Sequence, residues 1–269
     1  MSAQRLSGCA IGVVCGMLFV GVAPSPSQEA ALAQRGREIA LEADRRARGF
    51  GDYQAQMEMI LIDRRGEEMR RELELFSLEV SPDEERSLIY FHSPRDVRGT
   101  GLLTYSFRDG DEEQWLYLPA LRRTKRIAAS GRSSPFMGSE FAYEDLAPMY
   151  SSQYAYSYVG EEELEGTRCF VIERYPSYEG TGYRRQRLWI DTEEYRVLQV
   201  DSWDLRDRPL KTLTLSGYER YADSVWRPAE AHMINNRTNE ATRLRWYDYR
   251  FQTGLTESDF SRAALGRVR

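Results

Sequence analysis

The sequence predicts a mainly β protein in which one antiparallel sheet curves into an incomplete, half-open barrel. Apolar residues recur with a period of two, Gly- and Asp-containing turns separate these stretches at short intervals, and helical spacing is confined to one stretch near the N-terminus. About a dozen consecutive strands would make a wide twisted sheet, and such sheets tend to curl or split. No linker or internal repeat is evident, so we expect one domain.

The predicted helix comes first, and strands follow it to the end of the chain. Residues 29–48 distribute alanine, leucine and isoleucine among charged residues, and Gly49-Phe50-Gly51 ends this pattern. The first hairpin alternates apolar and polar residues on both sides of a turn at residues 63–66. The predicted strands are residues 53–61, 69–75, 86–92, 102–108, 114–118, 167–175, 184–190, 196–203, 211–221, 229–235 and 241–251.

The N-terminus has the pattern of a secretory signal peptide. Arg5 precedes an almost uncharged apolar run of about 15 residues, which is shorter than the ~20 residues that span a bilayer. Residues 1–33 are therefore predicted to be the signal peptide and processing region, with cleavage after Ala23 or Ala33. Residues 34–269 would form the exported domain.

Composition argues against several classes of function. The net charge of -5 disfavours nucleic-acid binding, which depends on a basic surface. Of the three cysteines, only Cys169 lies outside the signal, in an apolar run typical of a buried strand. His92 and His232 have no nearby nucleophile or metal-ligand spacing, and the acidic runs 112–113, 161–163 and 193–194 are expected at solvated turns. We therefore expect no catalytic residue, metal or cofactor.

The stretch from Trp115 to Asp145 is the most distinctive part of the chain. Trp115 and Tyr117 suggest an apolar wall formed by a strand, and Met57 and Met59 suggest a second one. A basic cluster follows, which is either a charged strand edge protected against aggregation or a docking patch for an acidic partner or anionic lipid headgroups. This cluster consists of Arg122, Arg123, Lys125 and Arg126.

An apolar loop follows the basic cluster. Phe136, Met137 and Phe141 lie between turn-forming residues, so these side chains either plug the sheet or form a movable lid over a hydrophobic cavity. Arg71 shares the period-two face of Met69 and Leu73, where an unpaired charge is costly. Its side chain either reaches water at the mouth of the barrel, contacts a ligand headgroup, or latches the lid.

Three blocks of sequence resemble the LolA-like family of outer-membrane lipoprotein-sorting proteins, in a poorly characterised periplasmic branch. They are GTGLL at residues 99–103, QWLYLPALRR at 114–123 and FMGSEFAYED at 136–145, and the resemblance extends over residues 38–260. It implies a half-barrel with helices over its open side and an apolar cavity for acyl chains. No block carries over the lid-holding arginine of the family.

The resemblance implies a non-enzymatic periplasmic carrier of lipoprotein acyl chains or other lipids between envelope membranes. A carrier of this kind would receive cargo through transient membrane contact, with an inner-membrane transporter of the resistance-nodulation-division type as a candidate partner, and we expect a monomer. The alternative is an envelope sensor or regulatory module that binds a protein partner. Cargo identity distinguishes these two functions.

Overall fold

The computed structural model describes residues 25–148, 150–221 and 225–266. The predicted signal peptide as far as residue 24, with the cleavage site after Ala23, lies outside the described residues. The other predicted cleavage site, Ala33, lies within helix α1 (Pro26–Arg46). Cleavage after Ala33 would therefore remove the first two turns of this helix.

Helix α1 begins three residues earlier than the apolar pattern indicated, because a capping box precedes it. The Ser25 hydroxyl accepts a hydrogen bond from the Gln28 backbone amide, and the Gln28 side chain accepts one from the Ser25 amide. Pro26 occupies the first turn, where no intrahelical amide donor is needed. The helix ends before Gly49, which has a φ of 89°.

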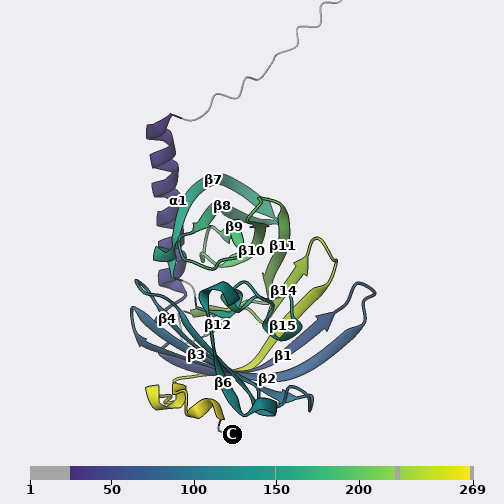
Figure 1. The fold of residues 1–269 in the computed structure, drawn as a ribbon. Helices are drawn as coiled ribbons and strands as arrows, with labels where there is room; N and C mark the ends of the chain where they lie inside the picture. The colour runs from purple at the N-terminus through teal and green to yellow at the C-terminus, as the bar shows by residue number, and fades with distance from the viewer. Residues whose placement is uncertain (1–24, 149, 222–224, 267–269) are drawn as a thin grey trace, which may run out of the picture.

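Thirteen strands form one antiparallel sheet that does not close, as the half-barrel prediction required (Figure 1). The order across the sheet is β6-β5-β4-β3-β2-β1-β15-β14-β11-β10-β9-β8-β7, and β12 and β13 form a separate pair. The strands are β1 (Asp52–Ile62), β2 (Glu68–Ser81), β3 (Glu84–Ser93), β4 (Gly101–Phe107), β5 (Glu113–Leu118), β6 (Arg123–Ile127), β7 (Tyr154–Leu164), β8 (Thr167–Pro176), β9 (Tyr183–Asp191), β10 (Val197–Asp204), β11 (Pro209–Ser216), β12 (Glu219–Tyr221), β13 (Val225–Arg227), β14 (Glu230–Asn235) and β15 (Ala241–Phe251).

Two local predictions were wrong, and no strand was predicted at β7. Residues 211–221 form two strands rather than one, because Gly217 adopts a φ of 64° and ends β11. Residues 161–163 belong to β7 rather than to a turn, and Glu162 lies opposite Cys169 in the ladder. The exposed edge of β7 allows these acidic side chains to stay solvated within a strand.

The strand order makes the chain cross the open side of the half-barrel once. Strands β6 and β7 are consecutive in the chain but lie at opposite edges of the sheet, so the connection between them must pass over the inner face. We call residues 128–148 the crossing segment. It contains the short 3-10 turns η2 (Ala129–Gly131), η3 (Phe136–Gly138) and η4 (Tyr143–Leu146), and it is the teal segment between the two halves of the fold in Figure 1.

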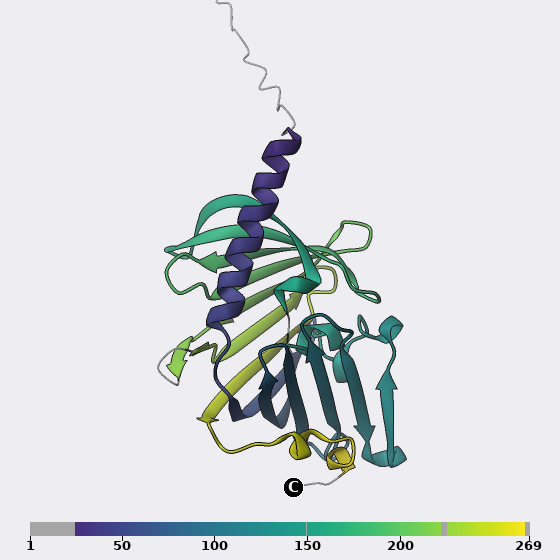
Figure 2. The ribbon, with the colours of Figure 1, turned by 90° about the vertical axis from the view of Figure 1, so that its left-hand side faces the viewer.

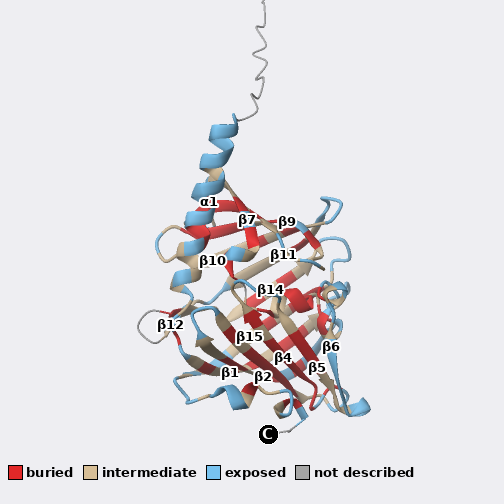
Figure 3. Ribbon diagram, turned by 60° about the vertical axis from the view of Figure 1, so that its left-hand side comes forward, coloured by how far each residue is buried: buried red, intermediate tan, exposed pale blue. Residues whose placement is uncertain are grey.

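The inner face of the sheet carries two hydrophobic clusters. The first, the inner cluster, lies where β1–β5, β14 and β15 meet, and it includes Met57, Met59 and Leu73. The second lies between α1 and strands β7–β10 and includes Ile39 and Ile172. Helix α1 runs along this second half, and its upper turns are exposed (Figure 3).

The outer face of the lower half is covered as well. The turns η6 (Glu257–Phe260) and η7 (Ala264–Gly266) lie beneath β3–β5, as Figure 2 shows in yellow. The Tyr105 hydroxyl donates to the Phe260 carbonyl at 2.6 Å, and the Tyr90 hydroxyl donates to the Ala264 carbonyl. Both faces of β4 and β5 are therefore buried, which explains their continuous apolar runs.

Candidate functional site

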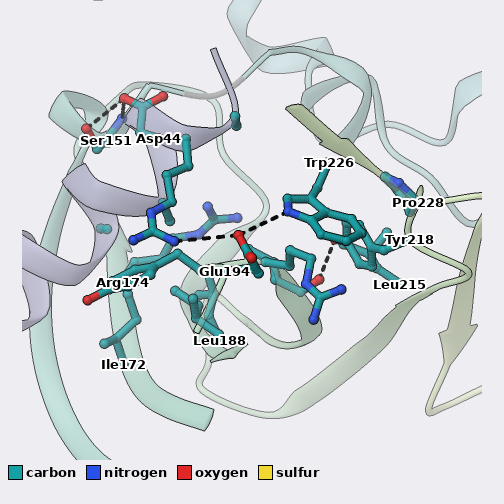
Figure 4. Close-up of a pocket in the computed structure, with 18 of the residues that line it drawn as sticks. Asp44, Ser151, Ile172, Arg174, Leu188, Glu194, Leu215, Tyr218, Trp226 and Pro228 are labelled. Atoms are coloured by element: carbon teal, nitrogen blue, oxygen red, sulfur yellow. Dashed lines mark hydrogen bonds and ion pairs between the residues drawn. The ribbon is translucent and has the colours of Figure 1, made fainter. Parts of the chain in front are cut away.

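A cavity of about 310 Å³ lies between α1 and the half of the sheet formed by β7–β11 (Figure 4). Small side chains, Ala40 and Ala43 of the helix and Ala47 at its C-cap, leave room on one side. Ile172 and Leu188 form the opposite wall. A largely apolar cavity of this size matches the lower end of the range for ligand pockets.

Aromatic side chains complete the cavity wall and carry polar groups that are mostly engaged by the protein. The Tyr218 hydroxyl donates to the Val197 carbonyl at 2.6 Å. The Trp226 indole donates to Glu194 Oε2 at 3.1 Å, as the dashed line in Figure 4 marks. Burial raises the pKa of the Tyr156 and Tyr218 phenols, so both stay neutral at physiological pH.

Four arginines and two carboxylates line the same cavity. They are Arg46, Arg174, Arg196, Arg227, Asp44 and Glu194. Arg46 Nη1 lies 3.7 Å from Glu194 Oε2, and Arg196 Nε lies 2.8 Å from Oδ2 of Asp191, which is outside the cavity lining. Arg227 donates instead to the Ala47 carbonyl from both terminal nitrogens at 3.2 Å. The lining therefore carries an excess of positive charge, although the protein is acidic.

A row of buried polar side chains crosses the inner face, beginning at Arg174 in the cavity wall. Arg174, Gln186, Ser202 and Lys211 lie opposite one another on β8–β11 in successive ladders. Arg174 Nε donates to Gln186 Oε1 at 2.8 Å, and Gln186 Nε2 donates to Ser202 Oγ at 3.0 Å. At the end of the row, Lys211 Nζ lies 3.7 Å from Asp145 Oδ2 of the crossing segment.

The crossing segment fills the lower half of the half-barrel. Phe136 and Phe141 are fully buried in the inner cluster with Met57 and Met59. The Phe136 ring lies 5.7 Å from that of Phe91. In this closed arrangement the two phenylalanines plug the sheet, and the predicted lid residues do not line the 310 Å³ cavity.

Arg71 fastens this plug to the sheet. Its Nη1 donates to the Met137 carbonyl at 2.6 Å, and it lies 3.9 Å from the Met59 sulfur. Arg71 is buried, and burial lowers the pKa of its guanidinium. Of the three sequence-based alternatives, the geometry matches the latch.

The second half of the crossing segment is held by its own carboxylates. Glu144 accepts hydrogen bonds from the Gly182 amide at 2.8 Å and the Tyr178 hydroxyl at 3.0 Å. The Tyr183 hydroxyl donates to both oxygens of Asp145, at 2.8 and 2.9 Å. Both carboxylates lie in the block at residues 136–145 that carried the family resemblance, which gives that block a structural role.

Trp115 and Tyr117 do not share a wall with Met57 and Met59. The ring of Trp115 lies 5.0 Å from that of Tyr105 and packs with Phe260 in a cluster on the outer face. Tyr117 packs against the same cluster. Alternation along β5 directs Leu116 inward instead, so the wall expected at Trp115 and Tyr117 faces outward, away from Met57 and Met59.

The basic cluster lies on the edge strand β6 and at the residue before it. Arg122, Arg123, Lys125 and Arg126 are all exposed, and Arg126 Nη2 pairs with Glu113 at 2.6 Å. Arg132 belongs to a different environment, because it is buried and donates to the Glu112 carbonyl at 2.5 Å. Glu112 itself was expected at a solvated turn, yet its Oε1 is buried without a hydrogen-bond partner. The crossing segment covers it.

Comparison with known proteins places this arrangement in a family. A family model described as "uncharacterized protein" matches residues 83–267. The crystal structure of a domain described as an outer membrane lipoprotein-sorting protein, from Vibrio parahaemolyticus, is 44% identical, with a TM-score of 0.85, over 87% of this chain and 100% of that chain. The chain belongs to the LolA-like lipoprotein-sorting family.

Two further structures share this fold. A DUF1329 family protein from Desulfovibrio piger is 29% identical, with a TM-score of 0.82, over 87% of this chain and 99% of that chain. The LolA superfamily protein NE2245 from Nitrosomonas europaea shares the fold, with a TM-score of 0.69 at 18% identity over 87% of this chain and 99% of that chain. None of the curated proteins matches this LolA-like chain.

His92 and Cys169 of this LolA-like protein lie in environments that the surrounding structure explains. His92 Nε2 lies 3.3 Å from Glu74 Oε2, and Cys169 is fully buried, where burial raises its thiol pKa. Among the described residues, no three or more His, Cys, Asp or Glu side chains gather as a metal site. No helix in the described part of the chain is long and apolar enough to cross a membrane.

Sequence reasoning missed the residues of the cavity. The tyrosines of β7, Arg174 and the alanines of α1 are far apart in the sequence and have no motif in common. One signal was available: the alanines at positions 40 and 43 of α1 and at its C-cap, position 47, have helical spacing, which leaves a shallow groove along one face.

Proposed function

We propose that this LolA-like protein is a periplasmic carrier that holds an acyl chain of a lipoprotein or another lipid and transfers it between envelope membranes. The observation that carries this proposal is the 310 Å³ cavity between α1 and β7–β11. Each methylene group that moves from water into such a site gains about 0.8 kcal/mol. No chemical step is required, only burial and release.

In this carrier, the acyl chain and the segment that closes the half-barrel occupy different halves of the fold. The acyl chain lies in the cavity of the upper half, whereas the crossing segment plugs the lower half through Phe136 and Phe141. Tyr150 and Ser151, which follow the crossing segment, line the cavity. A movement of the crossing segment would therefore change both the plug and the cavity wall, and longer or additional chains could then enter the lower half beside Met57 and Met59.

Native mass spectrometry of the mature protein after mild extraction tests the carrier function. We expect co-purifying lipid in the wild-type protein. Ala43→Phe, which fills the cavity from α1, should remove this lipid, and Leu41→Phe on the exposed side of the same helix should retain it. Detection of apoprotein alone in the wild type would overturn the proposal.

Strand β6 is the proposed docking edge for a partner. Its exposed arginines and lysine present cationic charge beside unpaired backbone groups, a combination suited to an acidic segment or to anionic headgroups. We propose that an inner-membrane transporter of the resistance-nodulation-division type, or transient contact with the membrane itself, uses this edge, with the carrier as a monomer. Crosslinking from position 124 in cells should recover the transporter; recovery of an anti-sigma factor would support the sensor function instead.

A further inference from the structure

Arg174 is an unusual residue in the wall of the cavity. It is only 7% exposed, and it lies on the inner face of β8 in the same row as Phe170 and Ile172. A buried guanidinium is costly unless hydrogen bonds or an opposite charge compensate it. Only Nε has such a partner, because within the part of the chain that the structure describes neither terminal nitrogen forms a hydrogen bond or an ion pair.

The two carboxylates of the cavity are engaged elsewhere. Asp44 pairs with Arg48 at 2.7 Å and accepts a hydrogen bond from the Ser151 hydroxyl at 3.0 Å. Glu194 accepts from Trp226 and faces Arg46. Neither forms an ion pair with Arg174 in the described residues, so the two terminal nitrogens of Arg174 stay available to a ligand.

The protein holds this guanidinium in one orientation. Nε is fixed by Gln186, and Gln186 is fixed by Ser202. The Tyr154 ring lies 4.5 Å from the guanidinium carbon and supports one face of the group. A planar guanidinium fixed in this way presents its terminal N–H groups as a fork, which matches the two oxygens of a phosphate or carboxylate.

An apolar row lies directly beside this fork. Ile172 and Leu188 are paired across β8 and β9. Ile172 lies two residues before Arg174 and Leu188 two residues after Gln186, a separation of about 7 Å along each strand. The charged fork and the apolar row therefore face the same cavity at the spacing of a headgroup and the first part of its chain.

We propose that Arg174 is the headgroup-binding residue of the cavity and that the cargo is a lipid with a phosphate or carboxylate headgroup. Its anionic oxygens accept from the terminal nitrogens of Arg174, and its acyl chain lies along Ile172 and Leu188 toward the alanines of α1. This inference rests on the carrier function proposed above and adds the chemical class of the cargo.

Isothermal titration calorimetry on delipidated mature protein tests the assignment. The probes are dodecyl phosphate, dodecanoate and the uncharged monododecanoylglycerol, with inorganic phosphate as a separate titrant. The wild-type protein should bind both anionic probes at least about tenfold more tightly than the uncharged one. Inorganic phosphate should bind far more weakly than dodecyl phosphate; comparable affinity would identify a free-anion site and overturn the lipid assignment.

Two variants test whether Arg174 causes the preference for anionic over uncharged probes. Arg174→Gln should reduce the preference for anions to nearly onefold without changing the affinity for monododecanoylglycerol, whereas Arg184→Gln, at an exposed position on β9, should preserve it. If Arg174→Gln does not fold, the wild-type comparison alone decides. Equal wild-type affinity for charged and uncharged probes would overturn this inference and leave the carrier function intact, while failure of every amphiphile to bind would overturn the carrier function.

Discussion

Arg71 Nη1 donates a 2.6 Å hydrogen bond to the backbone carbonyl of Met137, which ties strand β2 to the crossing segment. Met137 itself has a left-handed backbone conformation, with a φ of 49°. The bond joins two elements that are 66 residues apart in the chain. It lies at the point where the crossing segment enters the inner cluster.

Loss of this bond should free the plug. In Arg71→Leu we expect amide hydrogen exchange at residues 136–141 to accelerate by about ten- to a hundredfold, because a hydrogen bond from a charged donor contributes about 1.5–3 kcal/mol. The neighbouring exposed Arg70→Leu is the matched control and should leave exchange there unchanged. Unaltered exchange in Arg71→Leu would show that Arg71 is not the latch. Unaltered lipid binding in the same variant would exclude a role in the ligand site.

Glu112 should make stability depend on pH. Burial raises its pKa to about 8, with Glu144 adding to this effect and Arg132 opposing it. The folded state therefore holds a proton that the unfolded state releases near pH 4.5, so the stabilisation is complete below that pH and is lost as the pH rises through 8. Thermal unfolding between pH 5 and about 9 measures this slope.

The substitution Glu112→Gln removes this titration. It should raise the free energy of unfolding at pH 9 by about 1–3 kcal/mol relative to the wild type and flatten the slope. The exposed Glu67→Gln serves as the control and should leave the slope in place. A wild-type slope retained in Glu112→Gln would assign the pH dependence to another group.

Gly36 should be required for docking of α1. A Cβ at this position would lie 2.9 Å from both the Ser157 carbonyl carbon and the Tyr158 amide nitrogen of β7. Overpacking costs about 1–3 kcal/mol, which exceeds the gain of about 0.5–1 kcal/mol from replacing glycine in a helix. Gly36→Ala should therefore lower the free energy of unfolding and weaken lipid binding, whereas the adjacent exposed Arg37→Ala should change stability by less than about 0.5 kcal/mol. Chemical denaturation would detect the difference, and an equally stable Gly36→Ala would refute the contact.

Trp115 should contribute to stability but not to lipid binding. Its ring is buried on the outer face with Phe260 and Leu265, away from the cavity. Trp115→Ala should destabilise the fold by about 3–5 kcal/mol and leave the lipid content of the remaining folded protein unchanged. Tyr247→Ala, at a half-exposed site, is the control for loss of an aromatic side chain. Loss of bound lipid at constant folded fraction in Trp115→Ala would restore Trp115 to the binding site.

The strands and the helix were predictable because their signals are local. Alternation in β1 and β2, the continuous apolar run of β5 and the Gly49–Gly51 end of α1 each depend on a few consecutive residues. The same alternation identified Arg71 as a charge on an apolar face. The sequence pattern could not show which face of β5 points inward, since both faces are apolar. The outer face is the one that the C-terminal turns η6 and η7 cover.

The amino-acid sequence alone predicts a mainly β protein with one N-terminal helix, Arg71 on an apolar face and a family block at residues 136–145. Three features emerge only from the folded chain: this block crosses the open side between the two edge strands, Arg71 donates a hydrogen bond to it, and the cavity lies elsewhere, around Arg174. The sequence could not predict these features because the period of its apolar residues indicates only which face of a strand or helix a side chain occupies. Cavities and latches arise from pairs of residues that strand order brings together, and strand order depends on contacts between distant parts of the chain.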